Sequence, residues 1–364
     1  MKAQAAVLRG SEGPFTIEDL SVGEPQAGEV AVRMVAAGMC HTDVLIRELP
    51  PEFFPGPQVY GHEGAGVVES VGAGVTHVAP GDHVVLSFNN CGDCPACNQG
   101  RLPYCFNFQM ANTIGARADG STAFTDADGQ PVGSHYFGQS SFASHTVAAA
   151  NSVVKVDSTL DLARLGPLGC GVQTGAGAVL NTLGVESGAS LVVAGAGALG
   201  LSAVMAAKVA GAGTIIAIDR HESRLELATK YGATHVLSGD PAEMTGEIIE
   251  ATGGGADYAF DATGAAPVVR AVFNGLNNTG TCALAGVGLG DLVLDYMSMI
   301  SGRTLTGVME GDSTPSELIP YLAQLNAEGK FPFHELNVEF PLDQINEAEA
   351  ASADGSVVKP VLVF

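Results

Sequence analysis

Four cysteines lie close together in the sequence at spacings typical of a metal-binding loop. They are Cys91, Cys94, Cys97 and Cys105. Four thiolates on a short loop can surround a zinc ion tetrahedrally and leave no position open. Such a site stabilises a loop that is too short to form its own core. A disulfide pair is the alternative in an exported protein, and an iron–sulfur cluster uses the same four ligands.

Two further cysteines and one histidine lie far apart along the chain: Cys40, His62 and Cys170. Two cysteines and a histidine form the ligand set of catalytic zinc sites, which keep one position open for substrate. Spacing alone does not show that these three residues meet. An isolated cysteine or histidine is more often simply a packed side chain, so both interpretations remain open.

The sequence GAGALG at residues 195–200 matches the dinucleotide-binding pattern GxGxxG. Gly195 permits a tight turn, Gly197 lets a pyrophosphate approach the backbone, and Gly200 lets helix and strand pack closely. The N–H groups at the start of the following helix are then available to the phosphates. Asp219 is placed to bind an adenosine ribose, which favours NAD, although the adjacent Arg220 leaves NADP open. A glycine-rich structural turn is the alternative.

Helices and strands must position these residues, and the predicted secondary structure differs along the chain. After residue 190, short apolar runs alternate with helical segments, which predicts βαβ units and an α/β fold with a doubly wound parallel sheet. The predicted strands are 191–194, 214–218, 234–237, 257–260, 281–285 and 304–308. The predicted helices are 198–209, 222–231, 241–251 and 266–276.

The first 150 residues favour a β-rich domain with a long irregular excursion at 107–133. Its predicted strands are 29–35, 65–71, 82–87 and 142–148. The tail after residue 313 ends in an apolar strand, 357–364. We expect this tail to pack back on the first domain.

Composition excludes several classes of protein. A chain of 364 residues with 46% apolar and 15% charged residues is too apolar to be disordered and long enough for two domains. A net charge of −23 repels nucleic acids and anionic membranes, so we expect neither as a partner. The uncharged stretches 165–185 and 187–207 are broken by glycines and predict buried core rather than a membrane span. With no export signal visible, we expect a soluble, cytoplasmic protein.

Nearly the whole sequence resembles the zinc-dependent medium-chain alcohol dehydrogenases. The resemblance is carried by CHTD at 40–43, GHEGAGVV at 61–68, the four-cysteine lobe, GCG at 169–171, Thr174-Gly175, GAGALG at 195–200 and KPV at 359–361. Three motifs are closer to the aryl-alcohol (benzyl-alcohol) dehydrogenase branch: CPAC at 94–97, FGQSSFA at 137–143 and LGPLGC at 165–170. The resemblance implies a GroES-like catalytic domain at 1–171 with a zinc lobe at about 88–108, a Rossmann domain at 172–309, and a segment at 310–364 that returns to the catalytic domain.

The resemblance also implies a role for each residue of the catalytic site. Cys40, His62 and Cys170 would hold the catalytic zinc, and Glu63 would lie behind the metal. Asp43 would orient His62, as ligating histidines usually require.

Thr42 would hydrogen-bond the substrate oxygen and start a proton relay. Leu45 stands where well-known members have the histidine that passes the proton on, so the relay would continue through His41 or through water. The resemblance places these further residues at the cofactor: His41, Thr174, Ala198, Leu199, Val287 and Lys359. Simpler roles remain for Thr42 in a turn, Asp43 as a helix cap and Lys359 as a surface charge.

The activity implied is hydride transfer from a primary alcohol, of aryl or allylic type such as benzyl alcohols, to NAD, which gives the aldehyde reversibly. Each subunit would hold one catalytic and one structural zinc, and the protein would be a homodimer or homotetramer. An aliphatic or polyol dehydrogenase of the same family is an alternative. So is an NAD-binding zinc protein without catalytic activity.

Overall fold

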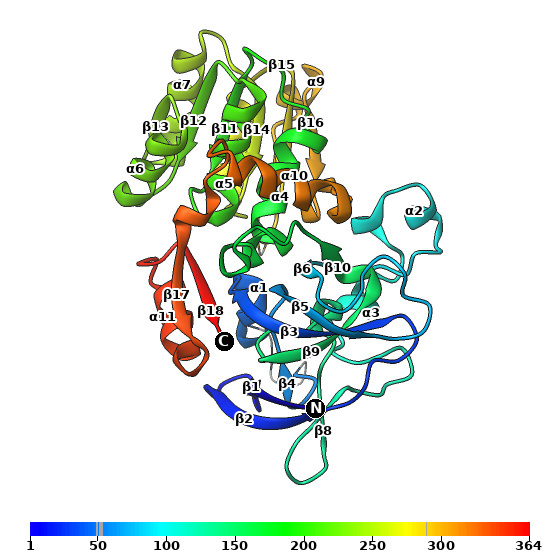
Figure 1. The fold of residues 1–364 in the computed structure, drawn as a ribbon. Helices are drawn as coiled ribbons and strands as arrows, with labels where there is room; N and C mark the ends of the chain where they lie inside the picture. Colours follow the sequence, from blue (N-terminus) through cyan, green and yellow to red (C-terminus); the bar gives the residue numbers. More distant parts are fainter. Residues whose placement is uncertain (49, 51–53, 289) are drawn as a thin grey trace. The chain divides into compact units, whose positions relative to one another are not determined.

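The computed structural model describes residues 1–48, 50, 54–288 and 290–364. The chain forms two compact units (Figure 1). The first comprises Met1–Gly171, Thr314–Ala327 and His334–Phe364, and the second comprises Val172–Ser313 and Glu328–Phe333. Among the described residues, no helix combines the length and apolar character needed to cross a bilayer.

The second unit is built on a six-stranded parallel sheet, with strand order β13-β12-β11-β14-β15-β16. The strands are β11 (Ser190–Ala194), β12 (Thr214–Ile218), β13 (His235–Leu237), β14 (Ala256–Asp261), β15 (Leu276–Leu284) and β16 (Thr304–Gly307). This order confirms the predicted Rossmann-type sheet. The winding reverses between β11 and β14, and sheets of this kind bind ligands at the carboxyl ends of the strands at such a point.

Helices connect the successive strands of this sheet. They are α5 (Ala198–Ala210), α6 (Glu222–Tyr231), α7 (Pro241–Thr252), α8 (Ala266–Asn274) and α9 (Tyr296–Ile300). Local sequence sets their ends. The Asp240 side chain accepts a hydrogen bond from Ala242 N at the start of α7, and Pro241 occupies the first helical position. The helix ends at Gly253, whose φ of 69° is the left-handed conformation that glycine adopts most easily.

The first unit contains two sheets. The larger has the order β10-β6-β5-β3-β18-β17, with β9 also pairing with β3. Its strands are β3 (Glu29–Gly38), β5 (Glu63–Val71), β6 (His83–Leu86), β9 (His145–Ala149), β10 (Val153–Lys155), β17 (Asn337–Pro341) and β18 (Lys359–Val363). In β18 the end of the chain pairs with β3, where Val361 lies opposite Gly38.

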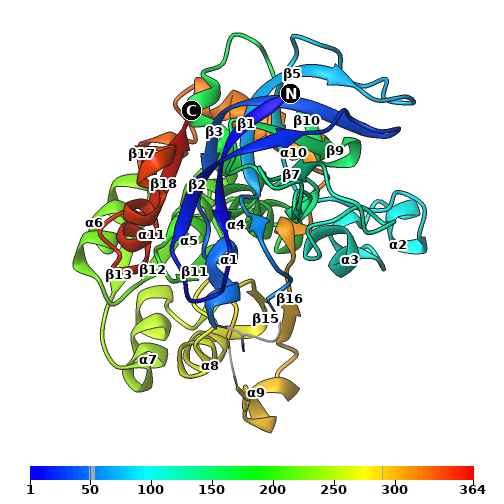
Figure 2. The same ribbon diagram turned by 90° about the horizontal axis from the view of Figure 1, so that it is seen from below.

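The smaller sheet has the order β4-β1-β2-β7-β8, and β1 and β2 lie side by side in Figure 2. Its strands are β1 (Lys2–Leu8), β2 (Phe15–Val22), β4 (Gln58–Val59), β7 (Phe124–Thr125) and β8 (Pro131–Val132). A shared apolar core includes Leu8, Phe124, Phe142 and Leu362, all fully buried.

The first unit also contains the helices α1 (His41–Val44), α2 (Pro95–Asn98), α3 (Phe108–Asn112), α10 (Pro315–Ala327) and α11 (Ile345–Ala353). The helix α4 (Gly171–Gly177) belongs to the second unit except for its first residue. The predicted strand at 142–148 begins only at His145, because Phe142 packs in the core and its N–H bonds to the Tyr60 carbonyl outside a strand. The predicted excursion at 107–133 contains α3, β7 and β8.

Candidate functional site

Three distant segments of the first unit bring Cys40, His62 and Cys170 together. Cys40 precedes α1, His62 precedes β5, and Cys170 follows the short helical turn η7 (Gly166–Gly169). One ligand atom from each residue, together with a carboxylate oxygen of Glu63, lies within 4.8 Å of each of the others. The antiparallel pairing of β3 with β5 places Gly38 opposite Glu63, so the segment before β5 lies beside the segment after β3.

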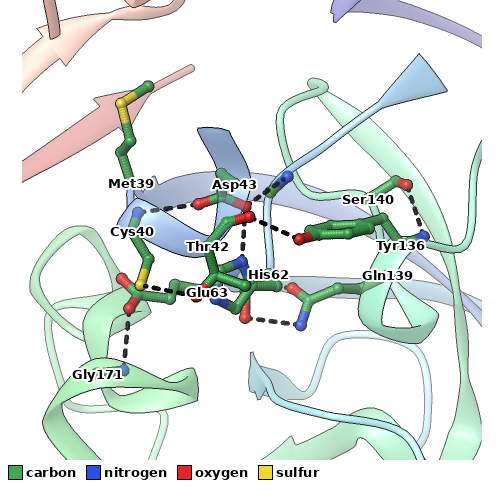
Figure 3. Close-up of polar contacts among 12 residues, drawn as sticks. Met39, Cys40, Thr42, Asp43, His62, Glu63, Tyr136, Gln139, Ser140 and Gly171 are labelled. Atoms are coloured by element: carbon green, nitrogen blue, oxygen red, sulfur yellow. Dashed lines mark hydrogen bonds and ion pairs between the residues drawn. The ribbon is translucent and has the colours of Figure 1, made fainter. Parts of the chain in front are cut away.

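His62 is oriented by a fully buried carboxylate. Its Nδ1 lies 2.6 Å from Asp43 Oδ1, which also accepts a hydrogen bond from Gly61 N at 3.1 Å. Asp43 Oδ2 accepts one from Cys40 N at 2.9 Å, so Asp43 also caps the start of α1 (Figure 3). Within the described part of the chain, the buried Nε2 of His62 has no hydrogen-bond partner. One imidazole nitrogen and two thiols are the donors that hold zinc in catalytic sites, and this nitrogen is available to a metal.

Neighbouring groups shift the pKa values of two of these ligands. Contact with the Cys170 thiol lowers the pKa of Cys40 well below its ordinary value; burial opposes this shift, and His62 and Lys359 add to it. Burial by itself lowers the pKa of His62, but the Asp43 carboxylate and the Cys40 thiol together raise that pKa well above its ordinary value, so a metal that binds this ring must displace a proton. Thiolates are the form of cysteine that binds metals.

Glu63 and Lys359 form a buried ion pair beside the ligands. Lys359 Nζ donates to both carboxylate oxygens of Glu63 at 2.9 Å and to the Met39 carbonyl at 3.1 Å. Gly171 N donates to Glu63 Oε1 at 3.0 Å. Burial lowers the pKa of Lys359, but the Glu63 carboxylate together with the Cys40 and Cys170 thiols outweighs burial and raises that pKa. The alternative that Lys359 is a surface charge is therefore wrong, since only 3% of the residue is exposed. Its predicted contact with cofactor phosphates stays a prediction.

Thr42 lies at the edge of this cluster. Its Oγ1 is 3.7 Å from Cys40 Sγ, and its carbonyl accepts a hydrogen bond from the Tyr136 hydroxyl at 2.9 Å. His41 is the exposed first residue of α1, and Leu45 begins the next helical turn, η1 (Leu45–Glu48).

The four-cysteine loop forms a second cluster in the first unit. The Sγ atoms of Cys91 and Cys105 are 3.4 Å apart, those of Cys94 and Cys97 3.5 Å, and those of Cys91 and Cys97 3.9 Å. A tetrahedral zinc with Zn–S bonds of about 2.3 Å separates its sulfurs by about 3.8 Å, so the cluster fits zinc. All seven cysteines of the chain are free thiols, which removes the disulfide alternative. Backbone N–H groups of Cys97 and Phe106 lower the pKa of Cys94 to about 6.

The GAGALG turn lies between β11 and α5 in the second unit. Gly195 has a φ of +88°, and a side chain at Gly200 would collide with the Gly195 carbonyl. A Cβ at Gly197 would instead project into open space, which leaves the backbone accessible to a pyrophosphate. Asp219 follows β12 and accepts hydrogen bonds from Ala196 N at 2.7 Å and His221 N at 2.9 Å. These features fit a dinucleotide.

The other predicted cofactor residues are spread over both units. Ala198 and Leu199 form the first turn of α5, and Arg220 is exposed beside Asp219. Thr174 is buried on α4, and Val287 is exposed in the connection after β15. His41 and Lys359 belong to the first unit.

One segment in contact with the site had no predicted role. Residues 137–143 were noted only as a branch motif, yet Gln139 in this motif contacts the His62 backbone, and Tyr136 just before it contacts Thr42. The motif itself was the only signal in the sequence. The partners in these two contacts are separated by 77 and 94 positions in the sequence, and local sequence patterns do not predict contacts over such separations.

Known proteins resemble this chain over its full length. A family model of the alcohol dehydrogenase GroES-like domain matches residues 26–158, and a zinc-binding dehydrogenase model matches residues 198–326. The geraniol dehydrogenase of Castellaniella defragrans is 43% identical, with 100% of this chain and 98% of that protein covered.

Two solved structures match as closely. An alcohol dehydrogenase zinc-binding domain protein from Burkholderia ambifaria is 46% identical with a TM-score of 0.97, and a benzyl alcohol dehydrogenase from Acinetobacter calcoaceticus is 41% identical with a TM-score of 0.94. Each match covers 100% of this chain and 99% of the other chain. The chain therefore belongs to the zinc-dependent medium-chain alcohol dehydrogenase family.

Proposed function

We propose that this protein oxidises primary allylic or aryl alcohols to aldehydes with NAD, and catalyses the reverse reduction. The observation that carries the proposal is the convergence of Cys40, His62 and Cys170 beside the Thr42 hydroxyl, with His62 Nε2 unpartnered among the described residues. A protein without catalytic activity would not need a three-ligand site that keeps a position open for substrate.

Each residue has a physical task in this proposal. Zinc, when bound, supplies Lewis acidity that lowers the pKa of the alcohol hydroxyl, and NAD accepts the hydride. Thr42 Oγ1 accepts the hydroxyl proton, and His41 or water takes the proton onward because Leu45 cannot. Asp43 holds His62 Nδ1, so that Nε2 faces the metal. Lys359 neutralises Glu63 behind the ligands.

The substrate class rests on the relatives. The similar proteins include a geraniol dehydrogenase and a benzyl alcohol dehydrogenase, and both names describe primary alcohols with an unsaturated carbon next to the carbinol carbon. The proposed alcohols share this feature. An aliphatic or polyol substrate is the alternative that a substrate panel distinguishes.

The proposal includes two zinc ions per subunit, one at each cluster. The free thiols of both clusters fit a reducing compartment such as the cytoplasm.

We further propose a homodimer or homotetramer. In the second unit, β16 is an edge strand, and large apolar side chains before it are exposed, namely Val293, Tyr296, Met297 and Ile300. An exposed apolar patch beside a free strand edge is typical of a subunit interface. Light scattering after gel filtration measures the subunit number.

The decisive experiment follows NADH absorbance over benzyl, cinnamyl, geranyl, aliphatic and polyol alcohols. We expect the highest kcat/KM with the aryl and allylic alcohols. The variants Cys40→Ser and His62→Ala should lose turnover, while Cys282→Ala, which removes a buried thiol of the second unit, should retain it. Near-normal turnover in both site variants would refute the proposed function.

A further inference from the structure

Residues 136–140 form a strained loop in the first unit, which we call the 136–140 loop. Phe137 and Ser140 have φ values of 51° and 50°, and Gly138 between them has a φ of 67°. Residues other than glycine rarely adopt this left-handed conformation, and they persist in it only where surrounding contacts hold them. The contacts that hold this loop lead to the cysteine–histidine site.

Gln139 uses its buried amide to bridge two backbone segments. Its Nε2 donates to the His62 carbonyl at 2.9 Å and to the Ser87 carbonyl at 3.0 Å, and its Oε1 accepts from Gly64 N at 3.1 Å. The residue is 0% exposed. Both N–H groups of the amide are therefore in use, and its oxygen is also occupied.

The amide lies where two strands separate. β5 and β6 pair in register at Ala65 and Val85, and their ladder ends there. Just beyond that pair, the Gln139 side chain hydrogen-bonds residues 62 and 64 on one side and residue 87 on the other. The amide thus fixes the peptide groups on both sides of Glu63. It sets where the His62 and Glu63 side chains leave the backbone.

Neighbouring residues of the loop contact the same site. The Tyr136 hydroxyl donates to the Thr42 carbonyl, and the Phe137 ring lies 4.5 Å from the His62 ring, between centroids (Figure 3 shows Tyr136, Gln139 and Ser140). Ser140 holds the loop closed, because its Oγ donates to the Val59 carbonyl at 2.6 Å and accepts from Tyr136 N at 3.0 Å. The loop therefore contacts both Thr42 and His62.

We propose that Gln139 is a positioning residue for the metal site formed by Cys40, His62 and Cys170. The inference rests on the metal site of the proposed function but not on its substrate. Gln139 touches neither the metal ligands' donor atoms nor Thr42 Oγ1. It acts through the backbone that presents His62 Nε2 and the Glu63 carboxylate.

The test is zinc affinity, measured by competition with a chromophoric chelator. Gln139→Leu keeps the side-chain size and removes all three hydrogen bonds. Cys40→Ser lacks a ligand of the catalytic site, so its zinc signal should come from the four-cysteine lobe alone. We expect Gln139→Leu to weaken zinc at the catalytic site by about 10–100-fold, the range for loss of a residue that orients a ligand, while lobe zinc is unchanged.

Asn346→Leu is the matched control. Asn346 also lies in the first unit and, like Gln139, hydrogen-bonds the backbone with its side-chain amide. It accepts from Phe15 N at 2.9 Å and donates to the Phe15 carbonyl at 3.0 Å. We expect this variant to retain wild-type zinc affinity. Equal weakening in both variants, or no weakening in Gln139→Leu, would overturn the proposal. Wild-type protein with no zinc signal beyond that of Cys40→Ser would overturn it together with the proposed function.

A second variant covers failure of the first to fold. Gln139→Glu keeps the acceptor for Gly64 N but places a carboxylate oxygen against two carbonyls, so zinc should again weaken; wild-type affinity in this variant would overturn the proposal. A second readout is the visible spectrum of the cobalt-substituted protein, which reports ligand geometry and which a purely structural residue would leave unchanged. If zinc affinity falls in Gln139→Leu but wild-type protein oxidises no alcohol of the panel, only the proposed function fails.

Discussion

We expect a single carboxylate, that of Asp219, to determine whether the protein prefers NAD or NADP. Asp219 directly follows β12, and its two oxygens accept hydrogen bonds from Ala196 N and His221 N. Asp219→Asn keeps the size of the side chain and one carbonyl oxygen while removing the charge that disfavours a 2′-phosphate. A hydrogen bond to a charged group contributes about 1.5–3 kcal/mol, so we expect the NAD/NADP ratio of kcat/KM to fall about tenfold or more.

Steady-state kinetics with both cofactors, in wild type and variant, give this ratio directly. Arg220→Ala is the companion variant, because this exposed cation follows Asp219 and would favour a 2′-phosphate once the carboxylate is neutral. An unchanged ratio in Asp219→Asn would show that another group recognises the ribose.

Individual residues also show how much of the site could be predicted from the sequence. The motif around Cys40 and His62 predicted the ligand set, and the structure places those atoms within reach of one metal. The sequence did not predict that the Lys359 amine would hydrogen-bond Glu63, 296 positions earlier, while its expected contact with the cofactor stays a prediction. The KPV motif does not show by itself whether its lysine faces solvent or a buried carboxylate. Only the pairing of β18 with β3 decides the matter.

At the scale of elements, we expect the four-cysteine loop to depend on the proposed structural zinc. It has two short helical turns, α2 and η3 (Leu102–Tyr104). Its buried cluster consists of three cysteines and Ala96, with Cys91, Leu102 and Phe108 partly buried against it. Cys97→Ser should therefore lower the zinc content from two ions to one per chain and unfold the lobe locally. Arg101, an exposed residue of the lobe, becomes a trypsin site in that state.

Metal analysis and timed trypsin digestion test the lobe. We expect cleavage after Arg101 to accelerate about tenfold or more, since each 1.4 kcal/mol of lost local stability raises the open population tenfold. Wild-type protein treated with a chelator is the control and should be cleaved at the same bond. Two zinc ions in Cys97→Ser, or unchanged cleavage, would contradict a structural role for the cluster.

Glu29 ties the first residue of β3 to the excursion at 107–133. Arg117 donates to both of its oxygens at 2.6 and 3.0 Å, and His135 Nε2 lies 3.1 Å from Oε1. Burial raises the pKa of Glu29, but hydrogen bonds from His135, Arg117 and Gln26 N lower it to about 2 from an ordinary 4.5. Because the folded-state pKa is the lower one, the ionised carboxylate stabilises the fold above pH 4.5. That stabilisation is lost as the pH falls towards 2.

The pH dependence is measured as the difference in free energy of unfolding between wild type and Glu29→Gln. We expect this difference to be constant above about pH 5 and to shrink as the pH is lowered through 4.5 towards 2. Groups outside the cluster cancel in the difference. A difference that stays constant down to pH 2.5 would show that the carboxylate has the same pKa in the folded and unfolded chain.

Elements of the two units differ in how far their sequence determines them. The strand at 214–218 and the helix at 222–231 have the predicted bounds, because apolar runs, caps and glycine stops are local signals. In the first unit, short strands such as β7 and β8 have two residues each and exist only through pairing with distant partners. The 136–140 loop is likewise defined by contacts with residues 42, 59, 62, 64 and 87, so its sequence alone did not reveal its role.

For the whole molecule, the excess of acidic residues is the dominant property. The 39 acidic residues outnumber the 16 lysines and arginines, so even complete pairing would leave 23 carboxylates unmatched. Exposed pairs such as Arg9 with Glu18 and Lys155 with Asp82 each contribute only about 0–1 kcal/mol. Repulsion among the unmatched carboxylates acts over longer distances and opposes both the compact state and subunit association.

Salt should therefore stabilise this protein, although it weakens the individual ion pairs. The screening length falls from about 30 Å at 0.01 M to about 3 Å at 1 M, which removes the long-range repulsion and weakens contacts near 3 Å less. We expect Tm to rise with NaCl concentration, by about 2–4 °C for each kcal/mol gained by units of this size, and the proposed oligomer to resist dilution better. Choline chloride at equal ionic strength separates screening from specific binding of sodium, because screening alone gives the same rise in both salts. A Tm that falls with salt would mean that the ion pairs outweigh the repulsion and that the acidic residues are arranged to avoid one another.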